Sequence, residues 1–456
     1  MFRSGHFRVA ILALADLILL YGVWASVILA YHAIGLGHYD PAFYLHLWPI
    51  GIVFVCVNSF FRLYHGGGMY PAAPVSPVEE LRRLVGASLL THVGVIAFLA
   101  FARQTTQDYS RVVIAVSGFL VALLAQPFRD VVRLGLSAFA IGRIPVIFAG
   151  SGEAAKRVVA TLDKDPYFGL RVVAQFDNDR VREVIPEAKR QKVRILVACQ
   201  DLRLFQCQME AYARWFTHVE YLPTARTFPI LGARAVTFDG LGGLEMVSQR
   251  QMGVLRVQKW MLDKGVAVLL FLGLLPLFVL IAILIKLTSR GPIFFRQERL
   301  GKDGRPIRVW KFRSMYVDAA ARLQKILEAN PEAAAEWERN FKLKADPRVT
   351  PLGRFLRRTS IDELPQLFNV FAGEMAVIGP RPIVQEEASY YGDSYKVFSS
   401  VLPGITGLWQ VSGRSDTDYG RRVELDTYYV LNWSPWMDIW ILLRTVWAVL
   451  SMNGAR

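Results

Sequence analysis

Alternating apolar and polar stretches divide the chain into three parts. Four apolar runs occupy the first part, at residues 9–31, 44–61, 84–101 and 112–128. Each run is close to the ~20 residues that a helix needs to cross a hydrocarbon core of roughly 30 Å. We therefore predict a membrane protein that begins with a bundle of four transmembrane helices, over residues 1–130.

Basic residues around this bundle predict its orientation. Arg3 and Arg8 precede the first run, and Arg62, Arg82 and Arg83 lie between the second and the third. The loop between the first two runs contains no Lys or Arg. Since cytoplasmic loops carry the excess of basic residues, both ends of the bundle are expected in the cytoplasm.

One carboxylate lies inside the first apolar run. An unpaired Asp16 would cost about 2.5–3.5 kcal/mol at the middle of a bilayer. We therefore expect Asp16 to pair with a residue of another helix or to lie near the headgroups, in a structural role.

Strands and helices alternate in the second part, residues 131–250. Short apolar runs at 144–149, 172–176 and 193–198 predict buried strands, and helical patterns lie between them. This alternation is typical of a small Rossmann-like α/β domain with a parallel sheet.

A glycine turn follows the first of these strands. Gly150, Gly152 and Ala155 resemble a nucleotide-binding fingerprint, and Asp177 stands loosely where a ribose-binding acid would be. This motif alone is a weak signal. The default prediction is a regulatory or assembly domain, with nucleotide binding as the alternative.

A further apolar segment opens the third part, residues 251–456. Residues 265–285 are long enough to cross a membrane, and Pro276 stands at their middle. Proline removes a helical hydrogen bond and kinks a helix. A helix that breaks at Pro276 and leaves by the face it entered keeps the rest of the chain in the cytoplasm. We predict this re-entrant path, with a fifth transmembrane crossing as the alternative.

Composition narrows the classes of protein that remain. The chain is 53% apolar yet carries a formal net charge of +15. This pairing suits a membrane protein whose cytoplasmic parts meet anionic headgroups or phosphorylated substrates. No zinc-finger spacing is present, so nucleic acid is not the expected partner. Three cysteines without metal-site or disulfide spacing fit a reducing cytoplasm.

Two adjacent carboxylates stand out in the third part, within RRTSIDELPQL at residues 357–367. Asp362 and Glu363 follow a run of arginines that includes Arg358, and the segment GPRP with Arg381 comes shortly afterwards. A carboxylate can attack phosphorus once arginine or Mg²⁺ neutralises the phosphoryl charge. The alternative is structural, since Ser360 and Glu363 have the spacing of a capping box.

A second basic motif precedes the carboxylates. Lys311 and Arg313 flank Phe312 at the end of a predicted strand, which would place both cations on one face and Phe312 on the other. Two fixed cations could hold a diphosphate. A solvated strand edge is the alternative, and spacing alone does not separate the two.

Three motifs in this order resemble the bacterial polyprenyl-phosphate sugar-1-phosphate transferases that have a monotopic catalytic core. The motifs are KFR at 311–313, the block at 358–367 and GPRP at 379–382. The likeness extends to WERNFKLK at 337–344 and PGITGLWQVSGR at 403–414. With the helical start and the α/β part, nearly the whole chain resembles the long form that transfers galactose 1-phosphate.

This resemblance implies a fold, a reaction and roles for residues. It implies a mainly helical cytoplasmic catalytic domain with Mg²⁺, at the bacterial inner membrane, that makes undecaprenyl diphospho-sugar and UMP from a UDP-sugar and undecaprenyl phosphate. Asp362 would be the nucleophile, and Glu363 would help to bind Mg²⁺ or handle the acceptor's proton. Lys311, Arg313, Arg358 and Arg381 would contact phosphate. The product would enter O-antigen, capsule or exopolysaccharide synthesis.

Several alternatives stay open at this point. Galactose is favoured by the resemblance, but glucose or an N-acetylhexosamine would use the same mechanism. A membrane-tethered sugar-nucleotide dehydratase is disfavoured, because no tyrosine is followed by Lys four residues later. A scaffold for glycan assembly would not need the Asp-Glu pair. A homodimer in contact with membrane lipids is expected.

Overall fold

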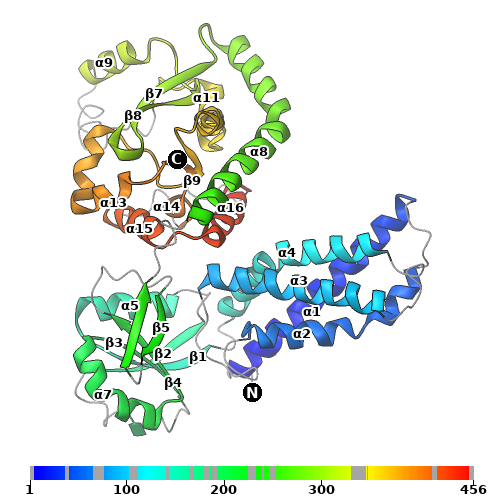
Figure 1. Cartoon of the computed structure of the whole chain (residues 1–456). Helices are drawn as coiled ribbons and strands as arrows, with labels where there is room; N and C mark the ends of the chain where they lie inside the picture. The colour runs from blue at the N-terminus through cyan, green and yellow to red at the C-terminus, as the bar shows by residue number, and fades with distance from the viewer. Residues whose placement is uncertain are drawn as a thin grey trace. The chain divides into compact units, whose positions relative to one another are not determined.

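The computed structural model divides into two compact units, Met1–Phe228 and Pro229–Arg456, which are described separately (Figure 1). It describes residues 5–35, 41–64, 76–101, 110–139, 143–164, 169–177, 185–186, 188, 190, 193–223, 233–238, 241–246, 253–329, 346, 348–412 and 419–450. The motif at 337–344 and the last residues of the motif at 403–414 lie outside the described residues.

The first unit begins with a bundle of four helices (Figure 1). They are α1 Gly5–Ala33, α2 Ile50–Phe60, α3 Pro77–Phe101 and α4 Arg111–Ala138. Their facing sides bury apolar residues such as Leu20, Phe54, Leu84 and Val121. Three of the four, α1, α3 and α4, are long and apolar enough to cross a membrane.

The structure differs from the prediction at the second span. Residues 44–61 form the end of a 3-10 helix, η1 Pro41–Leu47, followed by the 11-residue helix α2. At ~1.5 Å per residue α2 is about 16 Å long, shorter than a hydrocarbon core. Pro49 stands at its N-cap, where the N–H that proline lacks would have no intrahelical partner, and α2 begins after it.

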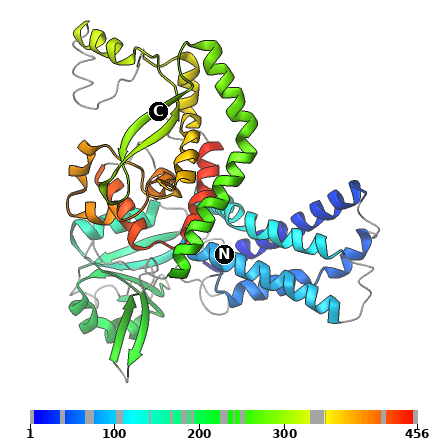
Figure 2. The same ribbon diagram turned by 45° about the horizontal axis from the view of Figure 1, so that its top comes forward.

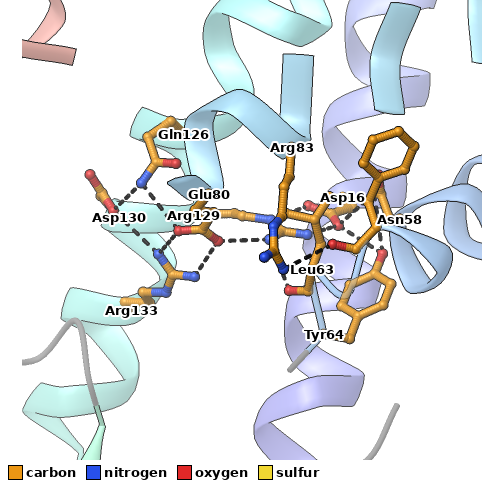
Figure 3. A network of polar contacts seen from close by, with 11 residues as sticks. Asp16, Asn58, Leu63, Tyr64, Glu80, Arg83, Gln126, Arg129, Asp130 and Arg133 are labelled. Carbon is orange, nitrogen blue, oxygen red and sulfur yellow. Dashed lines mark hydrogen bonds and ion pairs between the residues drawn. The ribbon is translucent and has the colours of Figure 1, made fainter. Parts of the chain in front are cut away.

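A network of buried charges joins α1, α3 and α4 (Figure 3). Arg129 donates from Nε to Oδ1 of Asp16 (2.8 Å) and from Nη1 to Oε1 of Glu80 (2.8 Å). Arg133, one turn later, donates to both oxygens of Glu80, at 2.8 and 2.5 Å. No side chain among these four is more than 2% exposed. The predicted pairing of Asp16 with another helix is therefore confirmed.

Further donors saturate the acids of this network. Asn58 Nδ2 and the Tyr64 hydroxyl donate to Oδ2 of Asp16 at 3.1 and 2.8 Å, and Gln126 Nε2 donates to Glu80. The predicted fourth span ended at residue 128, before the arginines, but α4 continues to Ala138. Because Arg129 and Arg133 are paired inside the bundle, their charges do not end the buried helix.

A four-stranded parallel sheet completes the first unit, as the alternating pattern predicts. Its strands are β1 Ile144–Ala149, β2 Leu170–Phe176, β3 Ile195–Gln200 and β4 His218–Pro223, in the order β2-β1-β3-β4. Helix α5 Gly152–Lys164 contributes Ala155 and Leu162 to the core on one face, and α7 Leu202–Trp215 contributes Tyr212 on the other.

The glycine turn after β1 is tightly packed against the sheet. A Cβ on Gly150, whose φ is +154°, would lie 2.5 Å from the carbonyl oxygen of Cys199. Gln175 Nε2 donates to the carbonyl oxygen of Gly150 at 2.9 Å, and Asp177 is exposed just after β2. These contacts explain why glycine is needed at position 150, while nucleotide binding at this turn stays a prediction.

A pair of strands and a long helix open the second unit. Strands β5 Ala233–Phe238 and β6 Leu241–Met246 form an antiparallel pair, and α8 Gly253–Thr288 follows. Helix α8 has 36 residues, contains Pro276 and is long and apolar enough to cross a membrane. It is continuous through Pro276, and Figures 1 and 2 show that it changes direction along its length. The helix thus bends along its length without breaking, and the re-entrant path stays a prediction.

The rest of the second unit is mainly helical, with two pairs of short strands. Its elements are β7 Phe294–Leu300, η4 Lys302–Gly304, β8 Pro306–Phe312, α9 Ala319–Ala329, α11 Pro351–Arg358, η5 Ile361–Gln366, α12 Leu367–Ala372, β9 Ala376–Ile378, η6 Gln385–Ser394, α13 Tyr395–Ser399, β10 Gly404–Thr406, α14 Leu408–Val411, α15 Tyr419–Leu431 and α16 Pro435–Leu450. The hairpin of β7 and β8 packs one face on α8 and α12 through an aromatic cluster that includes Phe278, Phe294, Phe312 and Phe368.

Candidate active site

The two adjacent carboxylates lie on η5, a single 3-10 segment between α11 and α12. Ser360 begins η5 in the left-handed conformation, with φ +57° and ψ +15°, which turns the chain sharply after α11. A residue other than glycine in this conformation is uncommon and costs energy. The turn points Asp362 into the protein, where it is 8% exposed.

The predicted capping box is wrong. Ser360 makes no side-chain cap, and only its carbonyl oxygen accepts from the backbone N–H of Glu363, at 3.2 Å. The left-handed backbone of Ser360 is incompatible with the extended conformation that an N-cap residue needs. The carboxylate of Glu363 is therefore available for other partners.

Glu363 is held by two cations. Lys311 Nζ donates to its Oε1 at 2.9 Å, and Arg381 Nη2 donates to the same atom at 3.0 Å. Burial by itself would raise the pKa of Glu363, but the positive charges of Arg381 and Lys311 outweigh it and lower the pKa to about 2. Glu363 is thus a permanent anion at neutral pH.

Asp362 has the opposite electrostatics. Burial, and then the negative charge of Glu363, raise its pKa to about 6, against the opposing charges of Lys311, Arg357 and Arg381. Within the described ranges, no donor forms a hydrogen bond with its carboxylate. Asp362 is therefore the unpaired member of the pair among the described residues, and its pKa is the one near neutrality.

Strand β8 positions Lys311. In the hairpin register Lys311 pairs with Phe295, and Phe312 pairs with Phe294 on the opposite face. The prediction that Lys311 and Phe312 point to opposite faces is confirmed. Lys311 and Glu363 line the same pocket. The residues that line it are Arg299, Val309, Lys311, Glu363, Gln366, Arg381, Pro382, Gly404 and Ile405.

Strands β9 and β10 position Arg381. They pair in parallel at Ala376 with Gly404, and the backbone N–H of Gly404 donates to the carbonyl oxygen of Pro380 at 2.8 Å. A Cβ on Gly404 would lie 2.1 Å from the backbone nitrogen of Gly379. Gly379 and Gly404 therefore let the two backbone segments pass close to each other, and this packing holds Arg381 against Glu363.

Arg313 does not join Lys311 at the pocket. Strand β8 ends at Phe312, and the guanidinium of Arg313 donates to the carbonyl oxygens of Ser289 and Arg290 at 2.8 and 2.9 Å. Lys311 and Arg313, which were expected to lie together, therefore contact different parts of the protein. Arg313 ties the end of α8 to the hairpin instead of facing the carboxylates.

The two arginines that end α11 also lie differently from the prediction, which gave the contact with the site to Arg358. Arg358 is exposed and makes no hydrogen bond with any residue that the structure describes. Arg357, one position earlier, donates from Nε to Oγ of Ser314 at 3.0 Å, and its charge acts on Asp362. Pro276 lies on α8, in the membrane-length helix and outside the pocket lining.

Sequence reasoning missed Arg299 as a pocket residue. The signal was available, because the glycines and aspartate at 301–304 indicate a hairpin turn. The register of that hairpin puts Arg299 on the same face as Lys311. Arg299 brings a third cation, and burial followed by repulsion from Arg381 lowers its pKa.

The donor atoms at this site suit a hard divalent cation shared with a substrate. No cluster of three or more His, Cys, Asp or Glu side chains occurs in the part of the chain that the structure covers. Mg²⁺ commonly takes only one or two carboxylates, with phosphates and water filling its other positions. Asp362 and Glu363 supply two such carboxylates, and Asp362 has no hydrogen-bond partner in the described part of the chain.

Comparisons with known proteins agree on one class. Residues 254–452 match the family described as bacterial sugar transferase. The chain is 33% identical over 403 residues to undecaprenyl-phosphate galactose phosphotransferase of Salmonella typhimurium, covering 82% of each chain. It is 33% identical over 366 residues to UDP-galactose-lipid carrier transferase of Erwinia amylovora, covering 74% of this chain and 75% of the relative. It is 34% identical over 324 residues to UDP-glucose:undecaprenyl-phosphate glucose-1-phosphate transferase of Klebsiella pneumoniae, covering 66% of each.

Proposed function

Since this chain belongs to the bacterial sugar transferases and is a membrane phosphoglycosyltransferase, we propose that it transfers a hexose 1-phosphate from a UDP-sugar to undecaprenyl phosphate. The products are undecaprenyl diphospho-sugar and UMP. One observation supports this proposal most strongly: Asp362 is buried without a hydrogen-bond partner among the described residues, and its neighbour Glu363 is held by Lys311 and Arg381.

The proposed reaction has two displacements at one phosphorus atom. The carboxylate of Asp362 attacks the phosphorus that bears the sugar, a P–O bond to this carboxylate forms, and the P–O bond to UMP breaks. An oxygen of undecaprenyl phosphate then attacks the same phosphorus and releases the carboxylate of Asp362. Atoms and charge balance without an oxidant or reductant, and each step passes through a phosphoryl transition state.

Three cations would stabilise that transition state. Lys311, Arg381 and Arg299 line the pocket together and meet the diphosphate of the donor. Glu363 holds Lys311 and Arg381 in place at 2.9 and 3.0 Å. Fixed charges in a water-poor site stabilise developing charge without reorganising during the reaction.

A bound Mg²⁺ fits this arrangement. Asp362 would hold it with help from Glu363, and the ion would withdraw charge from the diphosphate. The role proposed for Glu363 is to hold Lys311 and Arg381 in place beside the ion, because both of its oxygens accept from these two cations.

The acceptor lipid sets the proposed location. Candidate membrane helices occur in both units, and the basic residues near the bundle favour the cytoplasmic face for the catalytic domain. We place the protein in the bacterial inner membrane, where UDP-sugars reach it from the cytoplasm and membrane lipids surround α8. A homodimer is part of this proposal.

Galactose is the favoured sugar, since two of the relatives described above carry galactose in their names. Glucose stays an alternative because another relative is named for it. An N-acetylhexosamine would need only a different fit around the hexose ring. A scaffold for glycan assembly is disfavoured, because it has no use for a buried reactive carboxylate.

The test is UMP release by the full-length protein in detergent, with Mg²⁺ and undecaprenyl phosphate. UDP-galactose, UDP-glucose and UDP-N-acetylhexosamines are supplied in turn, and Asp362→Asn is the control. We expect UMP from one donor with wild type and none with the variant. No UMP from any donor, with folded wild-type protein, would remove the proposed function; equal release by Asp362→Asn would remove the proposed nucleophile.

A further inference from the structure

A second polar cluster lies outside the pocket lining, beyond Ile405 of β10. It is built by α14 and α15, which lie side by side (Figure 1). Arg422 on α15 is 7% exposed, and its buried Nε and Nη2 atoms have no hydrogen-bond partner among the residues that the structure describes. The buried indole nitrogen of Trp409 and the buried hydroxyl of Tyr419 likewise have none within the described ranges.

These unpaired groups gather around one guanidinium. The Cζ atom of Arg422 lies 4.8 Å from the ring centroid of Trp409 and 5.0 Å from that of Tyr419. Each of the three side chains offers at least one N–H or O–H donor. Buried donors without acceptors are rare in native proteins, and a group of them indicates that an acceptor is missing.

The charge around Arg422 tells what kind of acceptor fits. Glu387 and Asp426 approach its guanidinium at 3.8 Å, too far for good hydrogen bonds but close enough to balance the charge. Asp426 accepts a hydrogen bond from the hydroxyl of Tyr391 at 2.8 Å. Because two carboxylates already offset one guanidinium, a neutral acceptor fits better than a second phosphate.

The cluster is connected to the pocket that Glu363 lines. Gly404 and Ile405 line that pocket, and Gln410 Nε2 on α14 donates to the carbonyl oxygen of Ile405 at 3.0 Å. The charge of Arg422 also acts on Arg299, which lines the pocket from the hairpin side. A group bound at the cluster can therefore belong to the same molecule whose diphosphate meets Arg299.

We propose that Trp409, Tyr419 and Arg422 form a subsite that binds the neutral, oxygen-rich end of the sugar-nucleotide donor. This rests on the proposed function. The acceptors are either the carbonyl oxygens of uracil or the hydroxyl oxygens of the hexose, and both satisfy the same donors. If the hexose binds here, the cluster contributes to the choice of sugar.

Two conservative variants test the subsite at positions outside the catalytic pair. Tyr419→Phe removes one hydroxyl, and Trp409→Phe removes the indole N–H while keeping an aromatic ring. Tyr428→Phe is the matched control, since Tyr428 lies on the same helix and is 40% exposed. Each change is placed in full-length Asp362→Asn protein, so that binding is read without turnover.

Calorimetry then gives the Kd of UDP-galactose and of UMP in the presence of Mg²⁺, and thermal unfolding checks the fold. We expect Tyr419→Phe and Trp409→Phe each to weaken UDP-galactose binding about 3- to 10-fold, with Tyr428→Phe unchanged. A parallel loss for UMP assigns uracil to the subsite, and an unchanged UMP affinity assigns the hexose.

Unchanged binding of both ligands in both folded variants would overturn the subsite. That result differs from a failure of the proposed function, which would show as no UMP release by wild type from any donor. If one variant does not fold, the other decides, because each removes a different donor from the same cluster.

Discussion

Two buried clusters of acids and bases, one in each unit, use the same residue types in opposite ways. In the helical bundle, Asp16 and Glu80 meet Arg129 and Arg133, and none of these side chains is more than 2% exposed. At the active site, Glu363 is paired with Lys311 and Arg381, but its neighbour Asp362 accepts no hydrogen bond from the described residues. The Arg381 side chain there is 34% exposed.

The difference separates a structural cluster from a reactive one. Three acids, Asp16, Glu80 and Asp130, meet Arg129 and Arg133 in the bundle, and Asn58, Tyr64 and Gln126 donate further hydrogen bonds to these acids. A network in which each acid is paired with an arginine fixes one arrangement of helices. The active site keeps one carboxylate unpaired, a surplus of cations and an opening, which are features of a site that awaits a substrate.

The largest expected effect comes from neutralising the unpaired acid. Asp362→Asn should lower turnover on the order of 10⁴-fold or more, since it removes the proposed nucleophile. The same change should stabilise the protein by about 1–3 kcal/mol at pH 7, because ionising Asp362 in its buried site opposes folding. UMP release and thermal unfolding in detergent measure the two effects.

The size of this gain in stability depends on pH. The folded pKa of Asp362 is about 6, above the unfolded value of 3.8, so the folded state binds the extra proton between these values. The stabilisation by Asn should therefore be full above pH 6 and vanish towards pH 4. A variant that is less stable than wild type at pH 8 would contradict an unpaired Asp362.

Breaking the buried network of the helical bundle should lower stability and leave turnover unchanged. Arg129→Met leaves Asp16 and Glu80 with less compensation inside the bundle, and we expect a loss of about 3–5 kcal/mol of stability. Arg82→Met is the control, because Arg82 is 53% exposed on α3. Turnover per folded molecule should match wild type; a specific loss of turnover would show that this network takes part in catalysis.

Sequence reasoning reached the parts of both clusters that local pattern controls. The sequence predicted the Asp362–Glu363 pair, Lys311 on a strand and Arg381 between two prolines. The structure brings Glu363, Lys311 and Arg381 into contact. The four-helix bundle and the parallel sheet followed from period and length. In each case residues close in sequence carry the signal.

The missed features depend on rotation or on distant partners. A turn of about 100° per residue on α11 decides that Arg357 rather than Arg358 acts on Asp362. The end of β8 at Phe312 releases Arg313 towards Ser289 and Arg290. The partner of Asp16 is Arg129, and no local pattern links two residues that far apart in sequence.

The paired acid of the active site should respond like a weaker version of the bundle network. Glu363→Gln leaves Lys311 and Arg381 without their anion, and we expect a loss of about 1–3 kcal/mol at pH 7. Because its folded pKa of about 2 lies below the ordinary 4.5, this contribution is present above pH 4.5 and is lost as pH falls towards 2. Thermal unfolding from pH 7 to pH 3 should show the two proteins converging.

The rate should follow the ionisation of Asp362. Below its pKa of about 6 the nucleophile is protonated, so kcat/KM for the UDP-sugar should fall about tenfold for each pH unit. Above pH 7 this acid should impose no further change. Initial rates of UMP release between pH 5 and pH 8 measure the profile, and a flat profile would disagree with a buried attacking carboxylate.

The smallest expected effect compares the two arginines that end α11. Arg357→Gln removes a charge that favours ionised Asp362, so the pKa seen in the pH profile of kcat/KM should rise. Arg358→Gln is its matched control, since Arg358 is exposed and one residue away. Turnover at pH 8, where Asp362 is ionised in both, should differ only a few-fold from wild type. A shift in the profile of Arg358→Gln but not of Arg357→Gln would mean that Arg358 faces the reactive carboxylate, and the active site would then carry its surplus charge on the opposite side of α11.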